Sequence, residues 1–304
     1  MPNKSSPTLP AVGIYGLGIM GGTMAEELLK RGYKVCGFDI DAKAKQRFKK
    51  HGGQFLAKAS DVAGSADILI VSVSTAKALE QVTQAIVQGK SSRKTKTPPI
   101  VIETSTLTMV DKNLCAKTLK QVGITTLDCP ISGTAVRIKD RAWTIFASGT
   151  KTAFKTVHPL LTVFTDNVPY VGVFGNGTKL KFSANHLVAI YNVAYAESVA
   201  LARKMGLDPR EVLKLFGNSP VLGTGVMRLR MDMMVKRQYS PPTMKVEVWQ
   251  KDMEVIGQMA KSVDCPTPLF QASASIYTAA MAQGLSQEDT ASTAEVFAKM
   301  AGLP

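Results

Sequence analysis

The sequence has 304 residues, of which 45% are hydrophobic and 20% are charged. A chain of this length and composition can bury at least one sizeable core, which excludes intrinsic disorder, collagen and a disulfide-stapled mini-protein. The formal net charge of +14 either serves solubility or attracts anions such as nucleotides, carboxylates or nucleic acid.

The cysteines and histidines of the chain form no recognisable cluster. Cys36, Cys115, Cys129 and Cys265 contain no C-x-x-C pair, and the three histidines are equally scattered. Neither a disulfide framework nor a zinc site is predicted, so we expect reduced thiols and no bound metal.

The sequence shows no pattern typical of export or membrane insertion. Residues 1–7 lack the apolar core of a signal peptide, and apolar stretches such as Ile68–Val73 are far shorter than a membrane span. We therefore expect a soluble cytoplasmic protein.

The basic runs Lys43–Lys50 and Lys90–Lys96 indicate a polar helix face and a loop. They lack interleaved aromatic residues, so nucleic-acid binding is not expected.

The first half of the chain alternates apolar β-type runs with segments of helical periodicity. The predicted strands are Val12–Gly16, Lys34–Asp39, Asp67–Val73, Ile100–Glu103, Ile124–Asp128 and Trp143–Ser148, and the predicted helices are Met20–Arg31, Asp41–His51, Lys77–Gln88 and Thr108–Val122. This alternation predicts a parallel sheet with helices on both faces.

The pattern changes in the middle of the chain. Gly175 and Gly177 punctuate a last short strand, and an almost unbroken helical stretch follows from about Thr178 to Met205. Further helical segments run to the end without a convincing strand. We predict an α/β domain over residues 1–174 and an all-helical domain over residues 175–304.

Two helix starts are explicit in the sequence. Thr108 is a suitable N-cap with Asp111 in the first turn that follows. Asp208, Pro209 and Glu211 supply an N-cap, a proline at the first helical position and a capping-box acid.

A glycine-rich turn follows the first predicted strand. The pattern G-x-G-x-x-G lies between a strand and a helix, a context typical of dinucleotide binding, although a structural turn without a ligand is the alternative. Its glycines permit a tight turn, close approach of a pyrophosphate and close helix packing, and the helix N-terminus offers N–H groups to the anion. The predicted cofactor-binding residues of this turn are Gly16, Leu17, Gly18, Ile19, Met20 and Gly21.

The end of the second predicted strand favours NAD over NADP. Asp39 lies where a carboxylate accepts hydrogen bonds from the adenosine ribose hydroxyls, and it would repel a 2′-phosphate. Lys43 and Lys45 on the next helix leave NADP as the second possibility.

A nicotinamide cofactor implies hydride transfer, which needs a proton donor or acceptor for the substrate oxygen. Lys181 and Asn185 are four residues apart on the predicted long helix and therefore share a face. Taken alone, a lysine in this position is more often a solvated charge than a catalytic group.

Five segments in the same order resemble the β-hydroxyacid dehydrogenase family, whose members include 3-hydroxyisobutyrate dehydrogenase and tartronate semialdehyde reductase and which is related to 6-phosphogluconate dehydrogenase. They are Gly16–Gly21, Glu103–Thr106, Asp128–Gly133, Gly175–Gly177 with Lys181 and Asn185, and Lys251–Asp252. The resemblance covers nearly the whole chain from Ala11. It implies an N-terminal Rossmann domain, a long interdomain helix and a helical C-terminal domain.

The resemblance also implies roles for individual residues. Lys181 would be the general acid and base, with a pKa lowered toward neutrality by partial burial beside the nicotinamide, and Asn185 would orient the substrate hydroxyl or the lysine. The implied substrate-binding turn is Ser132, Gly133 and Thr134, and the further implied cofactor contacts are Val73, Ser74, Thr106 and Lys251. Ordinary turn and surface positions are the alternatives for Ser132 and Lys251.

The chain departs from the family pattern around the substrate-binding turn. Thr134 stands where the family usually has a second glycine, and Trp143 lies in a segment that is usually Gly-Thr-Leu. Arg137, Lys139 and Arg141 add three positive charges nearby, which are either solvated or share an anion. A guanidinium that faces the cleft would recognise a second anionic group of the substrate.

The resemblance predicts an NAD(P)-dependent dehydrogenase of a small hydroxyacid that assembles as a homodimer or homotetramer. An imine reductase shares the fold but typically lacks a lysine at the position of Lys181. A basic nicotinamide-binding module without turnover is the alternative from another functional class.

Overall fold

The computed structural model describes residues 9–93 and 97–304. The amino-terminal residues 1–7 and Lys94–Lys96 of the second basic run lie outside the described residues.

The chain divides into two compact units, Met1–Lys181 and Phe182–Pro304. The division falls inside a long helix, slightly beyond the point at which the sequence pattern changes. The domain boundary between residues 174 and 175 stays a prediction.

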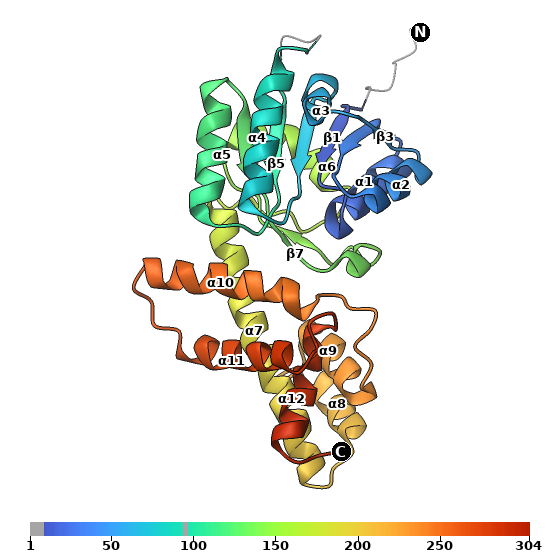
Figure 1. The fold of residues 1–304 in the computed structure, drawn as a ribbon, viewed down its shortest axis with the longest axis vertical. Helices are drawn as coiled ribbons and strands as arrows, with labels where there is room; N and C mark the ends of the chain where they lie inside the picture. The colour runs from blue at the N-terminus through green and yellow to red at the C-terminus, as the bar shows by residue number, and fades with distance from the viewer. Residues whose placement is uncertain (1–8, 94–96) are drawn as a thin grey trace. The chain divides into compact units, whose positions relative to one another are not determined.

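A six-stranded parallel sheet forms the centre of the first unit (Figure 1). Its strands are β1 (Val12–Tyr15), β2 (Val35–Phe38), β3 (Gln54–Phe55), β4 (Ile68–Val71), β5 (Ile100–Glu103) and β6 (Thr125–Asp128), in the spatial order β3-β2-β1-β4-β5-β6. The order reverses direction between β1 and β4, and dinucleotides bind at such a switch point in doubly wound sheets. The predicted parallel sheet is confirmed.

Helices cover both faces of the sheet. The helices are α1 (Ile19–Lys30), α2 (Ala42–Lys50) and α6 (Lys151–Leu161) on one face and α3 (Ala59–Ser65), α4 (Ala76–Lys90) and α5 (Met109–Gln121) on the other. Along β4, Ile68 and Ile70 pack into one hydrophobic cluster, whereas Leu69 and Val71 pack into the other. Because side chains alternate along a strand, a continuous apolar run is what a strand covered on both faces requires.

Among the elements that the sequence analysis missed in the first unit are one strand and two helices. They are β3, α3 and α6. The strand β3 has two residues and α3 has seven, too few to establish a period, and Pro159 interrupts the pattern of α6. The predicted alternation of strands and helices from β1 to β6 is confirmed, and these elements were missed.

The prediction that Trp143–Ser148 adds a strand to the parallel sheet was also wrong. Thr144–Ile145 (β8) pairs antiparallel with Ile131–Ser132 (β7) in a separate two-stranded sheet. The segment between them contains the short 3₁₀ helix η1 (Ala135–Ile138) and reverses the direction of the chain. A chain reversal gives antiparallel pairing, which an apolar run in the sequence does not distinguish from parallel pairing.

The second unit is helical, as predicted. Its elements are the greater part of α7 (Asn176–Lys204), then α8 (Pro209–Gly217), α9 (Gly225–Lys236), α10 (Val246–Ser262), α11 (Pro268–Ala282), η2 (Thr290–Ser292) and α12 (Thr293–Met300). Both explicit helix starts are confirmed, because Thr108 accepts a hydrogen bond from the backbone N–H of Asp111 and Asp208 accepts one from Arg210. In the described part of the chain, no helix combines the length and apolarity needed to span a bilayer.

The expectation of a short strand before the long helix was wrong, because α7 begins at Asn176 and Gly177 lies in its first turn. A Cβ on Gly177 would lie 2.3 Å from the carbonyl oxygen of Phe146. The glycine therefore lets the start of the helix approach the backbone of the first unit closely.

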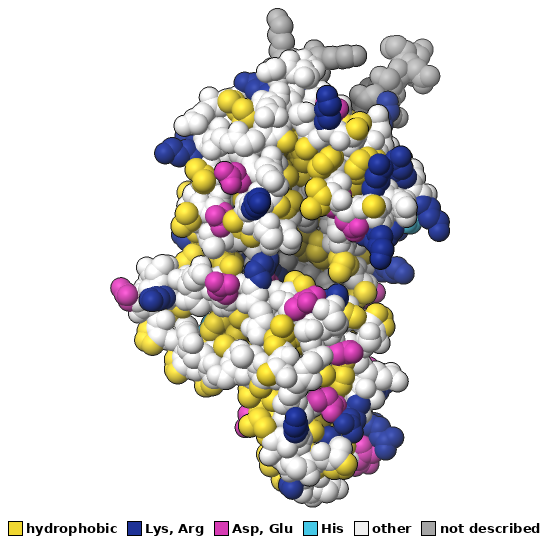
Figure 2. Space-filling view, viewed as in Figure 1, with side chains coloured by type: hydrophobic (Ala, Val, Ile, Leu, Met, Phe, Trp, Pro, Cys, Tyr) yellow, Lys and Arg dark blue, Asp and Glu magenta, His cyan; other side chains and the backbone are white. Residues whose placement is uncertain are grey.

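The basic run on α2 forms a polar helix face. Its lysines and arginine are exposed, whereas Ala44 and Phe48, one turn apart, are buried against the sheet. Figure 2 shows Lys and Arg side chains gathered at the edge of the first unit where α2 lies, with more scattered ones elsewhere on that face. The expectation of a solvated helix face is confirmed.

Candidate functional site

The glycine-rich turn lies at the carboxyl end of β1, as the sequence predicts. Gly16 has a φ of +84°, and a Cβ there would lie 2.1 Å from the carbonyl oxygen of Ser72. A Cβ on Gly21 would lie 1.9 Å from the carbonyl oxygen of Gly16. Backbone contacts within the unit therefore require glycine at both positions.

Gly18 differs from these two glycines, because a Cβ there would meet none of the described atoms within 4 Å. It is the N-cap of α1, which has no capping side-chain hydrogen bond and no acidic residue in its first turn among the described residues. Ile19 is 71% exposed beside it, whereas the side chain of Leu17 is buried in the core. An uncapped helix N-terminus next to open space is suited to a pyrophosphate.

Asp39 lies next to this turn, just after β2. Its Oδ2 accepts a hydrogen bond of 2.5 Å from the backbone N–H of Leu17, and its Oδ1 accepts one of 2.8 Å from Asp41. A carboxylate has about four acceptor sites, so it retains capacity for a ribose hydroxyl. Nζ of Lys45 lies over the ring of Phe55, 4.8 Å from its centroid, and this cation–π contact holds the ammonium group at the β3 edge of the sheet.

The other predicted cofactor contacts of the first unit follow β4 and β5. The backbone N–H of Val73 donates to Oγ of Ser105 at 3.0 Å, which links the two strand ends. Ser74 is exposed and Thr106 is half-buried. Because carboxyl ends of parallel strands share one edge, these residues lie at the same edge of the sheet as Gly18 and Asp39.

The predicted substrate-binding turn is held in shape by Trp143. The indole Nε1 of this buried residue donates to the carbonyl oxygen of Thr134 at 2.7 Å. Gly133 has a φ of +138°, and a Cβ there would lie 2.6 Å from Cδ1 of Trp143. Oγ1 of Thr134 is buried without a hydrogen-bond partner in the described part of the chain. Trp143 thus packs against the turn rather than forming part of its exposed surface.

The arginines near this turn are paired with carboxylates of their own unit. Arg141 donates to both carboxylate oxygens of Asp166, at 3.0 and 2.6 Å, and to the carbonyl oxygens of Thr162 and Val163. Arg137 forms a 3.1 Å ion pair with Asp140. Each of these two arginines thus has its own carboxylate partner, Asp140 for Arg137 and Asp166 for Arg141, and the two share no anion in the described part of the chain.

A buried ionic cluster, which the sequence did not predict, lies beneath the strand ends. Lys112 of α5 is 0% exposed and lies 2.7 Å from Oε2 of Glu103 and 2.6 Å from Oδ1 of Asp128. Burial alone would lower the pKa of Lys112, but the two carboxylates outweigh burial and raise it. The sequence contains no local signal for this cluster, because its partners lie on two different strands.

The same cluster binds the first turn of α7. Asp128 accepts hydrogen bonds from the backbone N–H and the hydroxyl of Thr178, at 2.8 and 2.7 Å. Oγ of Ser148 accepts one from the N–H of Gly177 at 3.0 Å. A carboxylate at a helix N-terminus is electrostatically favourable. Lys181, one turn further along α7, is therefore held at the carboxyl edge of the sheet.

In the second unit, Asp252 connects two predicted site residues. Its Oδ2 accepts a hydrogen bond of 3.1 Å from the side-chain amide of the buried Asn185, and its Oδ1 lies 3.3 Å from Nζ of Lys251. Asp252 belongs to one of the family segments, but its part in the site was not predicted. Its connection with Asn185, 67 residues away in the chain, depends on the packing of α10 against α7.

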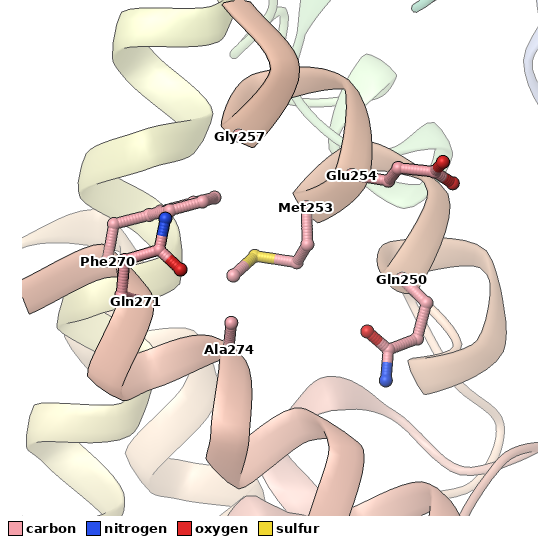
Figure 3. Close-up of a pocket in the computed structure, with 7 residues that line it drawn as sticks. All are labelled: Gln250, Met253, Glu254, Gly257, Phe270, Gln271 and Ala274. Carbon is pink, nitrogen blue, oxygen red and sulfur yellow. The ribbon is translucent and has the colours of Figure 1, made fainter. Parts of the chain in front are cut away.

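A hollow of about 430 Å³ lies between α10 and α11 (Figure 3). Met253, Phe270 and Ala274 point into it. None of the residues predicted to bind cofactor or substrate lines this hollow, so we do not assign the site there.

The described residues contain no group of three or more His, Cys, Asp or Glu side chains able to hold an ion. All four cysteines are described and are free thiols.

Two family models match consecutive parts of the chain. Residues 11–172 match the NAD binding domain of 6-phosphogluconate dehydrogenase. Residues 175–297 match the domain described as NAD-binding of NADP-dependent 3-hydroxyisobutyrate dehydrogenase. Together they cover both compact units.

Similar proteins include hydroxyacid dehydrogenases of about the same length. The L-threonate dehydrogenase of Haemophilus influenzae is 28% identical over 292 residues, which cover 94% of this chain and 95% of the relative. The crystal structure of 3-hydroxyisobutyrate dehydrogenase from Salmonella typhimurium is 28% identical and has a TM-score of 0.81, covering 94% of this chain and 99% of that one. An imine reductase from Pseudomonas sp., at 22% identity and a TM-score of 0.60, shares the fold alone.

Proposed function

The chain belongs to the β-hydroxyacid dehydrogenase family of NAD(P)-dependent oxidoreductases, and from this membership we propose that it transfers a hydride between NAD and a small 3-hydroxyacid, with Lys181 as general acid and base. The observation that carries the proposal is the hydrogen bonding of Thr178 to Asp128. It holds the start of α7, and with it Lys181, at the carboxyl edge of the sheet, where the glycine-rich turn also lies.

The residues at this edge fit a dinucleotide. The uncapped N-terminus of α1 next to Gly18 would bind the pyrophosphate, and Asp39 would accept hydrogen bonds from the adenosine ribose. The negative charge of Asp39 would repel a 2′-phosphate, and the ammonium group of Lys45 is held over the ring of Phe55. Both features favour NAD over NADP. With the adenosine half near β2, the nicotinamide half would lie over the ends of β4 and β5, beside Val73, Ser74 and Thr106.

In the oxidation, Nζ of Lys181 takes the proton from the substrate hydroxyl, while the hydrogen on the same carbon leaves with its electron pair. When bound, NAD⁺ supplies the acceptor for that hydride. In the reduction, protonated Lys181 returns the proton to the carbonyl oxygen. The backbone N–H groups of the turn Ser132–Thr134 and the hydroxyl of Ser132 would hold the substrate carboxylate. Asn185 would orient the hydroxyl or the lysine, and Lys251 would contact the cofactor.

Replacement of the proposed base tests this function. Lys181→Ala should lower turnover by about 10²- to 10⁴-fold with little change in NAD affinity. Lys179→Ala, at an exposed lysine two residues earlier on α7, is the matched control and should retain turnover. A panel of monocarboxylic and dicarboxylic hydroxyacids, assayed with NAD and NADP at 340 nm, identifies the substrate class. Near-normal turnover of Lys181→Ala contradicts the assignment.

We also propose that the protein acts in the cytoplasm as a homodimer or homotetramer. The support is an apolar face on the part of α7 in the second unit, where Leu187 and Leu201 are 47% and 58% exposed. Exposed apolar side chains in helical register are typical of an interface. Light scattering coupled to size exclusion measures the subunit number, and a monomer at micromolar concentration contradicts this part of the proposal.

A further inference from the structure

Lys112 is a buried cation whose ammonium group contacts four residues on three separate segments of the first unit. Besides its ion pairs with Glu103 and Asp128, Nζ donates to the carbonyl oxygen of Ser105 at 2.9 Å and to Oγ1 of Thr178 at 2.8 Å. An ammonium has three donors in a compact geometry, and here all of them are directed to groups of the protein.

Two of these contacts connect Lys112 with residues next to the proposed reaction site. Ser105 precedes Thr106 and also accepts the hydrogen bond from Val73, so its position determines that of the loops beside the nicotinamide half. Thr178 lies one turn before Lys181 on α7. Lys112 is therefore the group that connects the loop beside the cofactor with the helix that carries the base.

The connection is rigid because its members are buried. Glu103 and Asp128 are 0% exposed, as is Lys112, and Thr178 is 1% exposed. Asp128 has further acceptor contacts with Thr178 and Ser148, so its carboxylate cannot move without breaking several hydrogen bonds. Hydrogen bonds to charged groups in a buried setting are stronger than neutral ones, which favours one defined geometry.

We propose that Lys112 is a positioning residue for hydride transfer, which sets the distance between the Ser105–Thr106 segment and the first turn of α7. The proposal rests on the proposed function, since it takes Lys181 as the base. Because Lys112 is 0% exposed, it would act through Ser105 and Thr178 rather than by direct contact with substrate or cofactor.

The first test weakens the link to α7 at the hydroxyl of Thr178, which accepts a hydrogen bond from Lys112 and donates one to Asp128. Thr178→Val deletes the hydroxyl that joins Lys112 to the helix, whereas Thr178→Ser retains it. We expect Thr178→Val to lower kcat by about 10- to 100-fold, because a small displacement of a reacting group has effects of this size, and Thr178→Ser to restore most of the turnover. Affinities for NADH and for ADP-ribose, measured by calorimetry, should stay within about twofold of the wild type. Thr156→Val, which removes an exposed hydroxyl on α6, is the control.

The second test acts on the link to Ser105. The double variant Lys112→Met with Glu103→Gln removes one positive and one negative charge, so the net buried charge of the cluster is unchanged. The affinity of this variant for NADH should be about 10-fold lower than that of the wild type. Its affinity for ADP-ribose should be unchanged, since ADP-ribose lacks the nicotinamide that the Ser105–Thr106 segment would contact. This readout needs no turnover, so it distinguishes failure of the positioning role from failure of Lys181 as the base.

Two results overturn the proposal. One is wild-type kcat in Thr178→Val with native circular dichroism. The other is an equal loss of NADH and ADP-ribose affinity in the double variant, which indicates general disruption of the unit. If the double variant does not fold, the comparison of Thr178→Val with Thr178→Ser decides the matter: restoration by serine supports the proposal, and equal turnover of the two variants contradicts it.

Discussion

The backbone N–H of Leu17 donates a hydrogen bond of 2.5 Å to the carboxylate of Asp39, which joins the glycine-rich turn after β1 to the end of β2. The other oxygen of that carboxylate accepts from the N–H of Asp41. Asp39 therefore supports the shape of the turn in addition to its proposed contact with the adenosine ribose.

Substitution of Asp39 should change cofactor preference. Asp39→Asn keeps a side-chain acceptor for Leu17 but removes the charge that repels a 2′-phosphate. We expect the ratio of kcat/KM for NADP to that for NAD to rise about tenfold, equivalent to about 1.4 kcal/mol. Asp39→Arg should move the ratio further toward NADP, with lower overall activity because the turn loses its acceptor.

Asp67→Asn is the control for this change. Asp67 is a half-exposed carboxylate at the amino end of β4, on the opposite edge of the sheet from the glycine-rich turn. Its removal should leave the cofactor ratio unchanged. A wild-type protein that already prefers NADP would show that the lysines of α2 outweigh Asp39.

Asp252 should support catalysis through Asn185 and Lys251. Asp252→Ala removes one contact of each side chain, and we expect kcat to fall about tenfold or more because both groups lose a contact that helps to position them. Asp252→Asn retains a carbonyl acceptor for Asn185 and should recover part of the activity. Steady-state kinetics of both variants, with the exposed Glu254→Ala on the same helix as control, measure the effect. Full activity of the folded Asp252→Ala variant would contradict this prediction and would show that Asn185 and Lys251 do not depend on Asp252 for their positions.

Trp143 should influence substrate affinity. Trp143→Phe removes the hydrogen bond to the carbonyl oxygen of Thr134, and the loss of one such bond, about 0.5–1.5 kcal/mol, corresponds to a rise in KM for the hydroxyacid of about 3- to 10-fold. The affinity for NAD should not change, since the turn Ser132–Thr134 is not among the predicted cofactor contacts. An unchanged KM would show that packing alone holds the turn.

Arg141 should have no part in substrate selection, because Asp166 and two backbone carbonyls already occupy its guanidinium. Arg141→Ala and Arg137→Ala should leave the ratio of kcat/KM for a monoacid to that for a diacid within about twofold of the wild type. A large change in the ratio for Arg141→Ala would mean that the arginine exchanges Asp166 for the substrate.

The buried ion pair between Arg230 and Asp289 should stabilise the second unit. Asp289 also accepts hydrogen bonds from the N–H groups of Thr243 and Ala291. Asp289→Ala leaves Arg230 buried and unpaired and should lower the free energy of unfolding by about 3–5 kcal/mol. Asp232→Ala, which breaks an exposed pair with Lys236 on α9, should change it little. Urea denaturation of the full chain measures both.

The carboxylate of Asp289 should also make the free energy of unfolding depend on pH. Burial raises the pKa of Asp289, but Arg230 and the backbone hydrogen bonds outweigh burial and hold this pKa below the ordinary value. Its contribution is therefore complete above the unfolded-state pKa of about 3.9 and is lost as the pH falls through the folded-state pKa. The wild-type melting temperature should decrease more steeply below about pH 4 than that of Asp289→Ala. Parallel profiles for the two proteins would contradict this assignment.

The elements that the sequence predicted well are those specified by neighbouring residues. The strand β4 is apolar at every position, and Gly21 is required by its contact with the backbone of Gly16 within a single βα turn. The caps at Thr108 and Asp208 likewise involve only the next two or three residues. Side-chain periodicity and backbone sterics act over such short distances, so the α/β unit and the glycine-rich turn were predictable.

The relationships that the sequence left undetermined join residues distant in the chain. Lys112, between Asp111 and Asn113, resembles an exposed helix residue, and it is buried only because β5 and β6 are adjacent and bring Glu103 and Asp128 together. Pairing of buried charges depends on the order of strands and the packing of helices, and no local pattern encodes it. The residue types for the chemistry are therefore visible in the sequence, whereas the contacts that hold them at the site follow from the fold.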